Sequence, residues 1–229
     1  NIHFHPNRRQ ILLRLSQRPS AGTCTVTGAE DLAGNRSNPR STPVAYIPQV
    51  GSIAITELMY EPLADPFDSR PDQPEYLELY NRSDRSITTT GMYWTDRPAE
   101  NGAADTTYFP SGPTMIPAGE YAAVFADPGN THGTILHDAF PRPTGPLTLI
   151  AISSHSLGLR NDGESIRLHS RDDILLDSLS YMPAWHHPDL IDARGISLER
   201  ILIDGRSNDP SNWSSSLDPR GGSPGRANS

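Results

Sequence analysis

Three glutamates in the second quarter of the chain are the residues best suited to chemistry by type and spacing. Glu57 lies inside the apolar stretch IAITELMYEP at 53–62, and Glu75 and Glu78 lie in PEYLELYN at 74–81. A pair of carboxyl groups can hydrolyse a glycoside, but that reaction also needs a cleft lined by aromatic rings. With 8 Tyr, 5 Phe and 3 Trp in the chain, many of them needed for a core, we instead expect edge-strand carboxylates that pair with arginines or accept backbone N–H bonds.

Two further stretches carry side chains that could bind a metal ion, the acidic loop EPLADPFDSRPDQPE at 61–75 and WHHPDLIDARG at 185–195. Calcium binds about six to eight oxygens, but the first loop lacks EF-hand spacing and is stiffened by prolines. Adjacent histidines on a strand point to opposite faces and rarely serve one ion. We expect the stretch at 61–75 to be a solvated loop, with calcium binding as the open alternative. We expect the stretch at 185–195 to be a structural loop anchored by Trp185, and we expect no cofactor. The candidate ligands are Asp65, Asp68, Asp72, Glu75, His186, His187 and Asp189.

Nucleophile signatures are absent from the sequence, which has neither a G-x-S-x-G elbow nor a P-loop. The single cysteine, Cys24, excludes an internal disulfide and a cysteine-based zinc site. We expect it to be buried in the middle of a strand and unreactive. Glycosylation sequons occur at Asn35, Asn81 and Asn212, although such short matches are common by chance.

The charge of the chain restricts its partners. The net charge is -8, and all 19 basic residues are arginines. Non-specific nucleic-acid binding needs a basic surface, so we expect no nucleic-acid partner. No stretch of 18 apolar residues is present, so we expect no membrane span. The chain starts at Asn1 without Met or a signal peptide, which predicts a part of a longer or processed polypeptide.

The elements that would position these residues are short strands. The chain has 22 Pro and 18 Gly, and its short alternating apolar runs are bounded by turn residues, which predicts an all-β fold with little helix. A strand spacing of this kind suits a β-sandwich, with long connections at 61–74, 95–119 and 126–156. The Asp162–Gly163 pair predicts a hairpin turn. The expected strands are 11–15, 22–28, 42–48, 52–60, 75–81, 86–94, 121–126, 146–152, 164–170, 174–181 and 196–203.

The first segment of the chain resembles a known domain type. AGTCTVTGAEDLAGNRSNP at 21–39 resembles the last strands of a bacterial Ig-like domain, with Cys24 where an aromatic residue is common. Domains of that type serve as spacers in secreted and surface proteins. The resemblance implies that residues 1–47 are the C-terminal strands of such a domain, a short β segment that precedes the main domain.

Four stretches follow one another along the rest of the chain, at 53–62, 74–96, 116–126 and 157–181, and GISLERI with DPSNWSSSLDPRGGSPGRANS closes it. Together and in this order they resemble a lamin tail domain, the Ig-like module of nuclear lamins and of many bacterial secreted proteins. The departures are Thr90, where a leucine usually precedes the glycine, and the long connection at 126–156. The resemblance implies an Ig-like β-sandwich of the lamin tail type over residues 48–229.

Three functions follow as hypotheses. The first is a non-catalytic bacterial module, secreted or at the cell surface, that acts in structure, adhesion or assembly by binding other protein domains or surface components. The second is a targeting or substrate-binding module of a larger secreted hydrolase, because bacterial relatives are fused to nuclease or esterase domains. The third is a metal-dependent hydrolase, for which no complete site can be assembled from the sequence.

Overall fold

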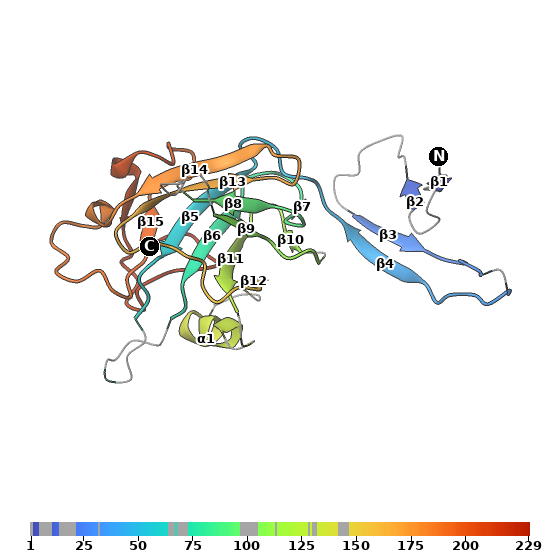
Figure 1. Cartoon of the computed structure of the whole chain (residues 1–229), viewed down its shortest axis with the longest axis horizontal. Helices are drawn as coiled ribbons and strands as arrows, with labels where there is room; N and C mark the ends of the chain where they lie inside the picture. Colours follow the sequence, from blue (N-terminus) through green and yellow to red (C-terminus); the bar gives the residue numbers. More distant parts are fainter. Residues whose placement is uncertain are drawn as a thin grey trace. The chain divides into compact units, whose positions relative to one another are not determined.

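The computed structural model describes residues 2–4, 11–13, 22–31, 33–63, 67, 73–96, 105–112, 114–127, 129, 132–141 and 147–229. The chain divides into two compact units, Asn1–Val44 and Ala45–Ser229 (Figure 1). The units thus meet after Val44, whereas the sequence predicts a boundary after residue 47. None of the helices in the described ranges is long and apolar enough to cross a membrane.

The first unit contains two antiparallel ribbons. β1 (Ile2–Phe4) pairs with β2 (Ile11–Leu13), and β3 (Gly22–Val26) pairs with β4 (Arg40–Val44). Cys24 on β3 is half-buried, so the expectation of a buried thiol was wrong. A two-stranded ribbon has few residues to cover either of its faces, which explains this exposure.

The second unit is built from two main sheets and one small ribbon. The six-stranded sheet has the order β12-β11-β6-β5-β15-β16, and the four-stranded sheet has the order β14-β13-β8-β9 (Figure 1). The strands of the first sheet are β5 (Ile53–Met59), β6 (Tyr76–Asn81), β11 (Tyr121–Ala126), β12 (Thr148–Ile152), β15 (Leu198–Arg200) and β16 (Trp213–Ser215). The strands of the second are β8 (Tyr93–Thr95), β9 (Thr106–Tyr108), β13 (Glu164–His169) and β14 (Leu175–Tyr181). The remaining elements are the ribbon of β7 (Ile87–Thr88) and β10 (Met115–Ile116), helix α1 (His132–Ala139) and the single turns η1 (Pro183–Trp185) and η2 (Pro210–Asn212).

The main hydrophobic core is shared by both sheets. Leu77 and Leu79 of β6 belong to the same buried cluster as Leu168 of β13 and Leu179 of β14. Because side chains alternate along a strand, Tyr76 of β6 faces the other way. That opposite side, here called the outer face, carries a second cluster in which α1 takes part. The fold is therefore mostly β and is compatible with a sandwich whose larger sheet is covered on both faces.

Most of the strands that the alternation of apolar residues predicts are present in the structure. The strand at 121–126 is confirmed at both ends, and those expected at 52–60, 75–81, 164–170 and 174–181 are each confirmed with ends shifted by a residue. Asn81 starts the turn after β6, because its Oδ1 accepts the N–H of Ser83 at 3.0 Å.

Several expected boundaries were wrong. The strand expected at 86–94 is divided into β7 and β8 around Gly91, whose φ is 75°. The connection at 95–119 contains β9 and β10, and the strand expected at 196–203 ends at Arg200. Gly163 closes a turn, but that turn leads into β13 from a segment that is not a strand. The antiparallel hairpin is instead formed by β13 and β14.

A bulge in β5 determines how the two sheets are joined. Ile55 pairs with Leu79 and Glu57 pairs with Glu78, so Thr56 is an extra residue without a partner on β6. On its other side, β5 pairs with β15 only at Glu57 and Leu58.

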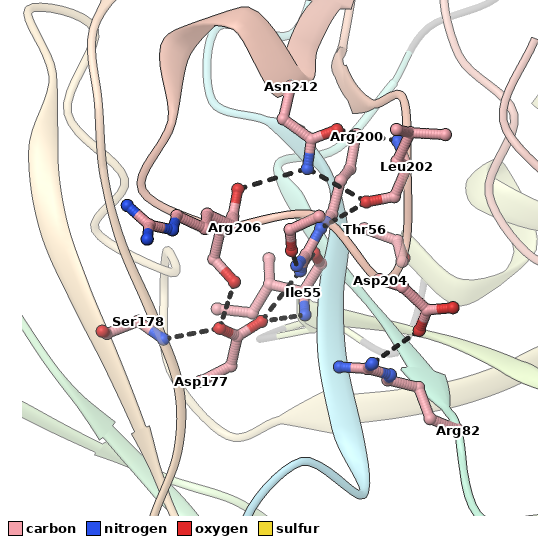
Figure 2. Close-up of polar contacts among 12 residues, drawn as sticks. Ile55, Thr56, Arg82, Asp177, Ser178, Arg200, Leu202, Asp204, Arg206 and Asn212 are labelled. Carbon is pink, nitrogen blue, oxygen red and sulfur yellow. Dashed lines mark hydrogen bonds and ion pairs between the residues drawn. The ribbon is translucent and has the colours of Figure 1, made fainter.

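The backbone groups of Ile55 are satisfied by an ion pair instead of a neighbouring strand. Its N–H donates to Asp177 Oδ2 at 2.9 Å, and its carbonyl accepts from Arg200 Nη1 at 3.1 Å (Figure 2). Arg200 and Asp177 lie 3.1 Å apart, with side chains only 2% and 12% exposed. Since Arg200 is on β15 and Asp177 is on β14, this ion pair links the two sheets.

The buried ion pair is fully surrounded by polar partners. Arg200 also donates to the carbonyls of Leu202 at 3.2 Å and Gly205 at 2.5 Å. Asp177 also accepts the N–H of Ser178 at 2.8 Å and the hydroxyl of Ser207 (Figure 2). Burial lowers the pKa of Arg200, and the charge of Asp177 opposes that shift.

We expect Arg200→Met to reduce the free energy of unfolding by about 3–5 kcal/mol, because it leaves the buried charge of Asp177 without its cation and the carbonyls of Ile55 and Gly205 without the donor that Arg200 provides. The matched control is Arg82→Met, whose ion pair with Asp204 has side chains 29% and 90% exposed (Figure 2). That change should cost at most about 1 kcal/mol. Denaturant unfolding followed by tryptophan fluorescence measures both, since all 3 tryptophans lie in the second unit. Equal losses in the two variants would contradict the linking role of Arg200.

Candidate functional site

Three glutamates from neighbouring strands lie side by side on the outer face of the six-stranded sheet. Glu57 of β5 is directly opposite Glu78 of β6 on one side and Glu199 of β15 on the other. All three side chains are buried, at 0%, 0% and 3% exposure. Their strand neighbours Leu58, Leu77 and Leu198 belong to the core between the sheets, so the glutamates face away from it. Glu57, Glu78 and Glu199 are here called the acidic row.

Hydroxyl and backbone N–H groups surround the acidic row. Glu57 Oε1 accepts from the hydroxyls of Tyr76 at 2.6 Å and Ser197 at 2.5 Å. Glu78 Oε1 accepts the hydroxyl of Thr56 at 2.6 Å, because the bulge turns this side chain to the outer face. Among the described residues, Glu57 Oε2 has no hydrogen-bond partner, although it is buried.

The last residues of the chain, 216–229, cover the acidic row and are here called the strap. The N–H of Ser223 donates to Glu57 at 2.8 Å, and the N–H of Gly225 donates to Glu78 at 2.5 Å. Glu199 accepts the hydroxyl of Ser223 at 2.8 Å and the N–H of Ser229 at 2.7 Å. Residues 221–225 are all buried. The three carboxyls therefore hold the strap against the sheet.

Two carboxyls of the acidic row, Glu57 and Glu78, hold their protons more tightly than an ordinary glutamate does. Burial raises the pKa of Glu57 to about 7, and the charge of Glu199 adds to that rise. Burial, followed by the charge of Glu57, raises the pKa of Glu78 well above its usual range. Across the described parts of the chain, no hydrogen bond or ion pair joins an arginine to these carboxyls. We infer that protons, in place of arginine side chains, neutralise Glu57 and Glu78 below pH 7.

The expectation for Glu57 and Glu78, pairing with arginines or accepting backbone N–H bonds on an edge strand, was right in its second alternative and wrong about the edge strand. Both accept backbone N–H bonds, as expected. They lie on the interior strands of the sheet, not on its edges, and their partners are hydroxyls and amides instead of arginines. The sequence analysis also missed Glu199. Glu57 stands out because it lies inside an apolar run, whereas Glu199 has an apolar neighbour, Leu198, on one side only and Arg200 on the other.

Glu75 lies apart from the acidic row. Its Oε2 accepts the hydroxyl of Ser156 and the N–H of Leu157, each at 3.0 Å. Burial raises its pKa, and these hydrogen bonds oppose the shift. Glu75 lines a cleft of about 360 Å³ together with Tyr60, Gln73, His132, His155 and their neighbours. The structure thus does not assemble Glu57, Glu75 and Glu78 into one site.

The histidine stretch at 185–195 places its two rings in different surroundings. His186 is buried, its Nδ1 lies 2.8 Å from the Ser215 hydroxyl, and burial lowers its pKa to about 4. The His187 side chain is 59% exposed and lies 3.9 Å from Asp189. Trp185 packs against Trp213 with ring centroids 6.1 Å apart. These contacts agree with a structural loop.

The other metal candidates do not form a site in the part of the chain that the structure describes. Asp65, Asp68 and Asp72 lie outside the described residues. Within the described ranges, no three His, Cys, Asp or Glu side chains come together in an arrangement that could hold a metal ion.

The asparagines of the three glycosylation sequons differ in their exposure to solvent. The Asn81 amide is buried and donates to the carbonyls of Arg85, Ile116 and Pro117 at 2.7, 3.0 and 2.9 Å. The Asn212 amide is also buried and donates to Leu202. These two amides have structural roles that leave no room for a glycan, whereas Asn35 is exposed.

No protein-family model matches the chain, and no curated protein is significantly similar to it.

We expect Gly222→Ala to destabilise the second unit by about 1–3 kcal/mol, since an added Cβ would clash with the Tyr76 hydroxyl and would lie 2.9 Å from Glu57 Oε1. Gly112→Ala is the matched control, because a Cβ there meets no atom within 4 Å. It should change stability by no more than about 0.5 kcal/mol. Chemical denaturation of both variants is the measurement, and a harmless Gly222→Ala would contradict the tight fit of the strap.

We expect the free energy of unfolding to fall between pH 5 and pH 8. The pKa of Glu57 is about 7 in the folded protein against an ordinary value of 4.5. The folded state therefore holds this proton more tightly, and the resulting stability is complete below 4.5 and is lost as the pH rises through 7. Glu57→Gln should reduce the fall by an amount on the order of 3 kcal/mol or less. Asp204→Asn, at an exposed position, should keep the wild-type slope, and a stability that rises over this range would refute the assignment.

Proposed function

We propose that this chain is a non-catalytic, secreted or cell-surface module that binds other protein domains or surface components. The observation that carries the proposal is the burial of the acidic row. Glu57 and Glu78, two of the three glutamates that the sequence offers for catalysis, are covered by the strap and hold it in place. A substrate could not reach them without displacing that segment, so their role is architectural.

We further propose that the second unit is an Ig-like sandwich of the lamin tail type and that the first unit is the end of a bacterial Ig-like domain. Support comes from the order of the stretches that carry the resemblance. They correspond to β5, to β6 through β8, to β11, and to β13 with β14. The closing stretch contains β15, β16 and the strap.

Strand edges and loops are the proposed contact surfaces. β9 is an edge strand of the four-stranded sheet, and its Tyr108 is 66% exposed. Edge strands have free backbone groups that can pair with another chain. Ile191 and Leu217, in loops near the chain's last strands, are also exposed apolar side chains. Such groups suit a protein partner better than a nucleic acid, since the net charge of the chain is -8.

The alternative, a targeting or substrate-binding module of a larger secreted hydrolase, is favoured by one observation. The cleft at Glu75 offers Tyr60 and two histidines, His132 and His155, to a bound group. In this alternative the catalytic residues would belong to another domain of the same polypeptide.

Peptide mapping of the native polypeptide by mass spectrometry separates the two functions. Flanking Ig-like domains or a surface-sorting tail are expected for the structural module. A flanking nuclease or esterase domain would overturn the first proposal in favour of the second. Hydrolysis of ester, phosphodiester or glycoside substrates by this chain itself, lost in Glu75→Gln, would overturn both.

We expect the melting temperature to be the same in calcium and in chelator, because the stability of the second unit comes from its core, its ion pair and the strap. Differential scanning calorimetry with either calcium chloride or EDTA is the measurement. A transition that moves upward by several degrees in calcium would instead place an ion in the acidic loop at 61–75.

A further inference from the structure

The strap is attached to the sheet through the acidic row and through further hydrogen bonds, among them those that the Asn228 amide donates to the carbonyls of Thr56 and Arg200 at 2.9 and 2.8 Å. Each carboxyl of the row receives at least one backbone N–H from the strap, from Ser223, Gly225 or Ser229. Backbone pairing adds the Ser197 N–H to the Gly221 carbonyl at 2.7 Å and the Ser216 N–H to the Ser197 carbonyl at 3.0 Å. The attachment therefore depends on how many charges the row carries.

The cross-strand register makes full ionisation of the row unfavourable. Directly opposite side chains in an antiparallel sheet have Cβ atoms about 4.5–5.5 Å apart, and like charges at that separation repel. Glu57 stands between Glu78 and Glu199 and so faces both of them. The buried Oε2 of Glu57 has no hydrogen-bond donor among the described residues. A negative charge on Glu57, added to that of a neighbouring glutamate, would therefore not be compensated at this atom.

The groups that face the row come from four directions. β6 contributes Tyr76 and Glu78, β15 contributes Glu199, and β11 contributes Tyr121, whose pKa is raised to about 12 by burial and by the charge of Glu78. From the strap, only backbone N–H groups and serine hydroxyls reach the row.

The charged side chains of the strap are paired with one another. Asp218 binds Arg220 at 2.9 Å and also binds Arg226. Hydrogen bonding to Arg220 holds the pKa of Asp218 at about 2. This internal set keeps its charges unchanged between pH 5 and pH 9, so it does not compensate new charge in the row.

We propose that the strap is a pH-dependent latch, closed on the outer face of the sheet while the acidic row holds its protons and released when the row becomes fully ionised. The strands beneath are expected to stay in place, because their other face belongs to the main core and the Arg200–Asp177 pair links the sheets. Release would expose the row and the buried hydroxyl of Tyr76 to solvent. The latch does not depend on the proposed binding function.

Hydrogen exchange measured by mass spectrometry tests the latch in the full chain. After correction for the intrinsic exchange rate, amides of residues 216–229 should lose protection by about ten-fold or more between pH 6 and pH 9. Peptides from β13 and β14 should remain protected. The double variant Glu57→Gln, Glu78→Gln should keep the strap protected at pH 9. Glu164→Gln is the matched control, since Glu164 is a buried carboxyl with a pKa of about 7 that binds Tyr181, and it should behave as the wild type.

Three results would overturn the latch. The first is equal strap protection at both pH values. The second is a loss shared equally by the strap and by β13 and β14, which would mean global unfolding. The third is an undiminished loss in the folded double variant.

Trypsin cleavage of the wild-type chain decides the question if the double variant does not fold. Arg220 and Arg226 both lie in the strap. Release of the C-terminal peptides, relative to cleavage of a small reference substrate, should accelerate by about ten-fold or more between pH 7 and pH 9. An unchanged relative rate would overturn the proposal.

Discussion

The bulge at Thr56 is the feature on which the rest of the second unit depends. One extra residue in β5 turns both Thr56 and Glu57 to the outer face, and Ile55, just before it, pairs with β6 but not with β15. The buried pair of Arg200 and Asp177 then satisfies Ile55 and links the two sheets (Figure 2). Because the bulge turns Thr56 to the outer face, the hydroxyl of Thr56 can donate a hydrogen bond to Glu78 of the acidic row.

The acidic row shows how a sheet can bury carboxyls without cations. A buried charge is unfavourable unless it is paired, and a carboxyl in that position instead keeps its proton. Hydroxyls of Tyr76 and Ser197 and the N–H groups of the strap provide the hydrogen bonds that such groups require. Glutamates that resemble a catalytic pair in the sequence thus become the attachment points of a C-terminal segment.

Much of the sheet structure could be predicted from the sequence, because the relevant signals are local. The alternation of Leu77 and Leu79 with polar neighbours located β6, and the apolar run at 121–126 located β11. The bulge was not predicted, since β5 is buried on both faces, and its sequence therefore gives no clear alternation in which a break at Thr56 could be recognised. The burial of Glu199 and of the strap depends on contacts between distant segments. A stretch such as GGSPGRANS has the composition of an exposed tail, yet residues 221–225 are buried over the carboxyls that accept the N–H groups of Ser223 and Gly225.

The protonation of the acidic row can be measured directly by carbon NMR of the side-chain carboxyl groups in protein labelled at glutamate. At pH 6 the resonances of Glu57 and Glu78 should have the positions of neutral carboxyls, and that of Glu57 should move to the ionised position near pH 7. Single Glu→Gln variants would assign each resonance. If all three carboxyls of the row were already ionised at pH 5, a bound cation rather than protons would have to neutralise them, and protonated carboxyls could not be what attaches the strap to the sheet.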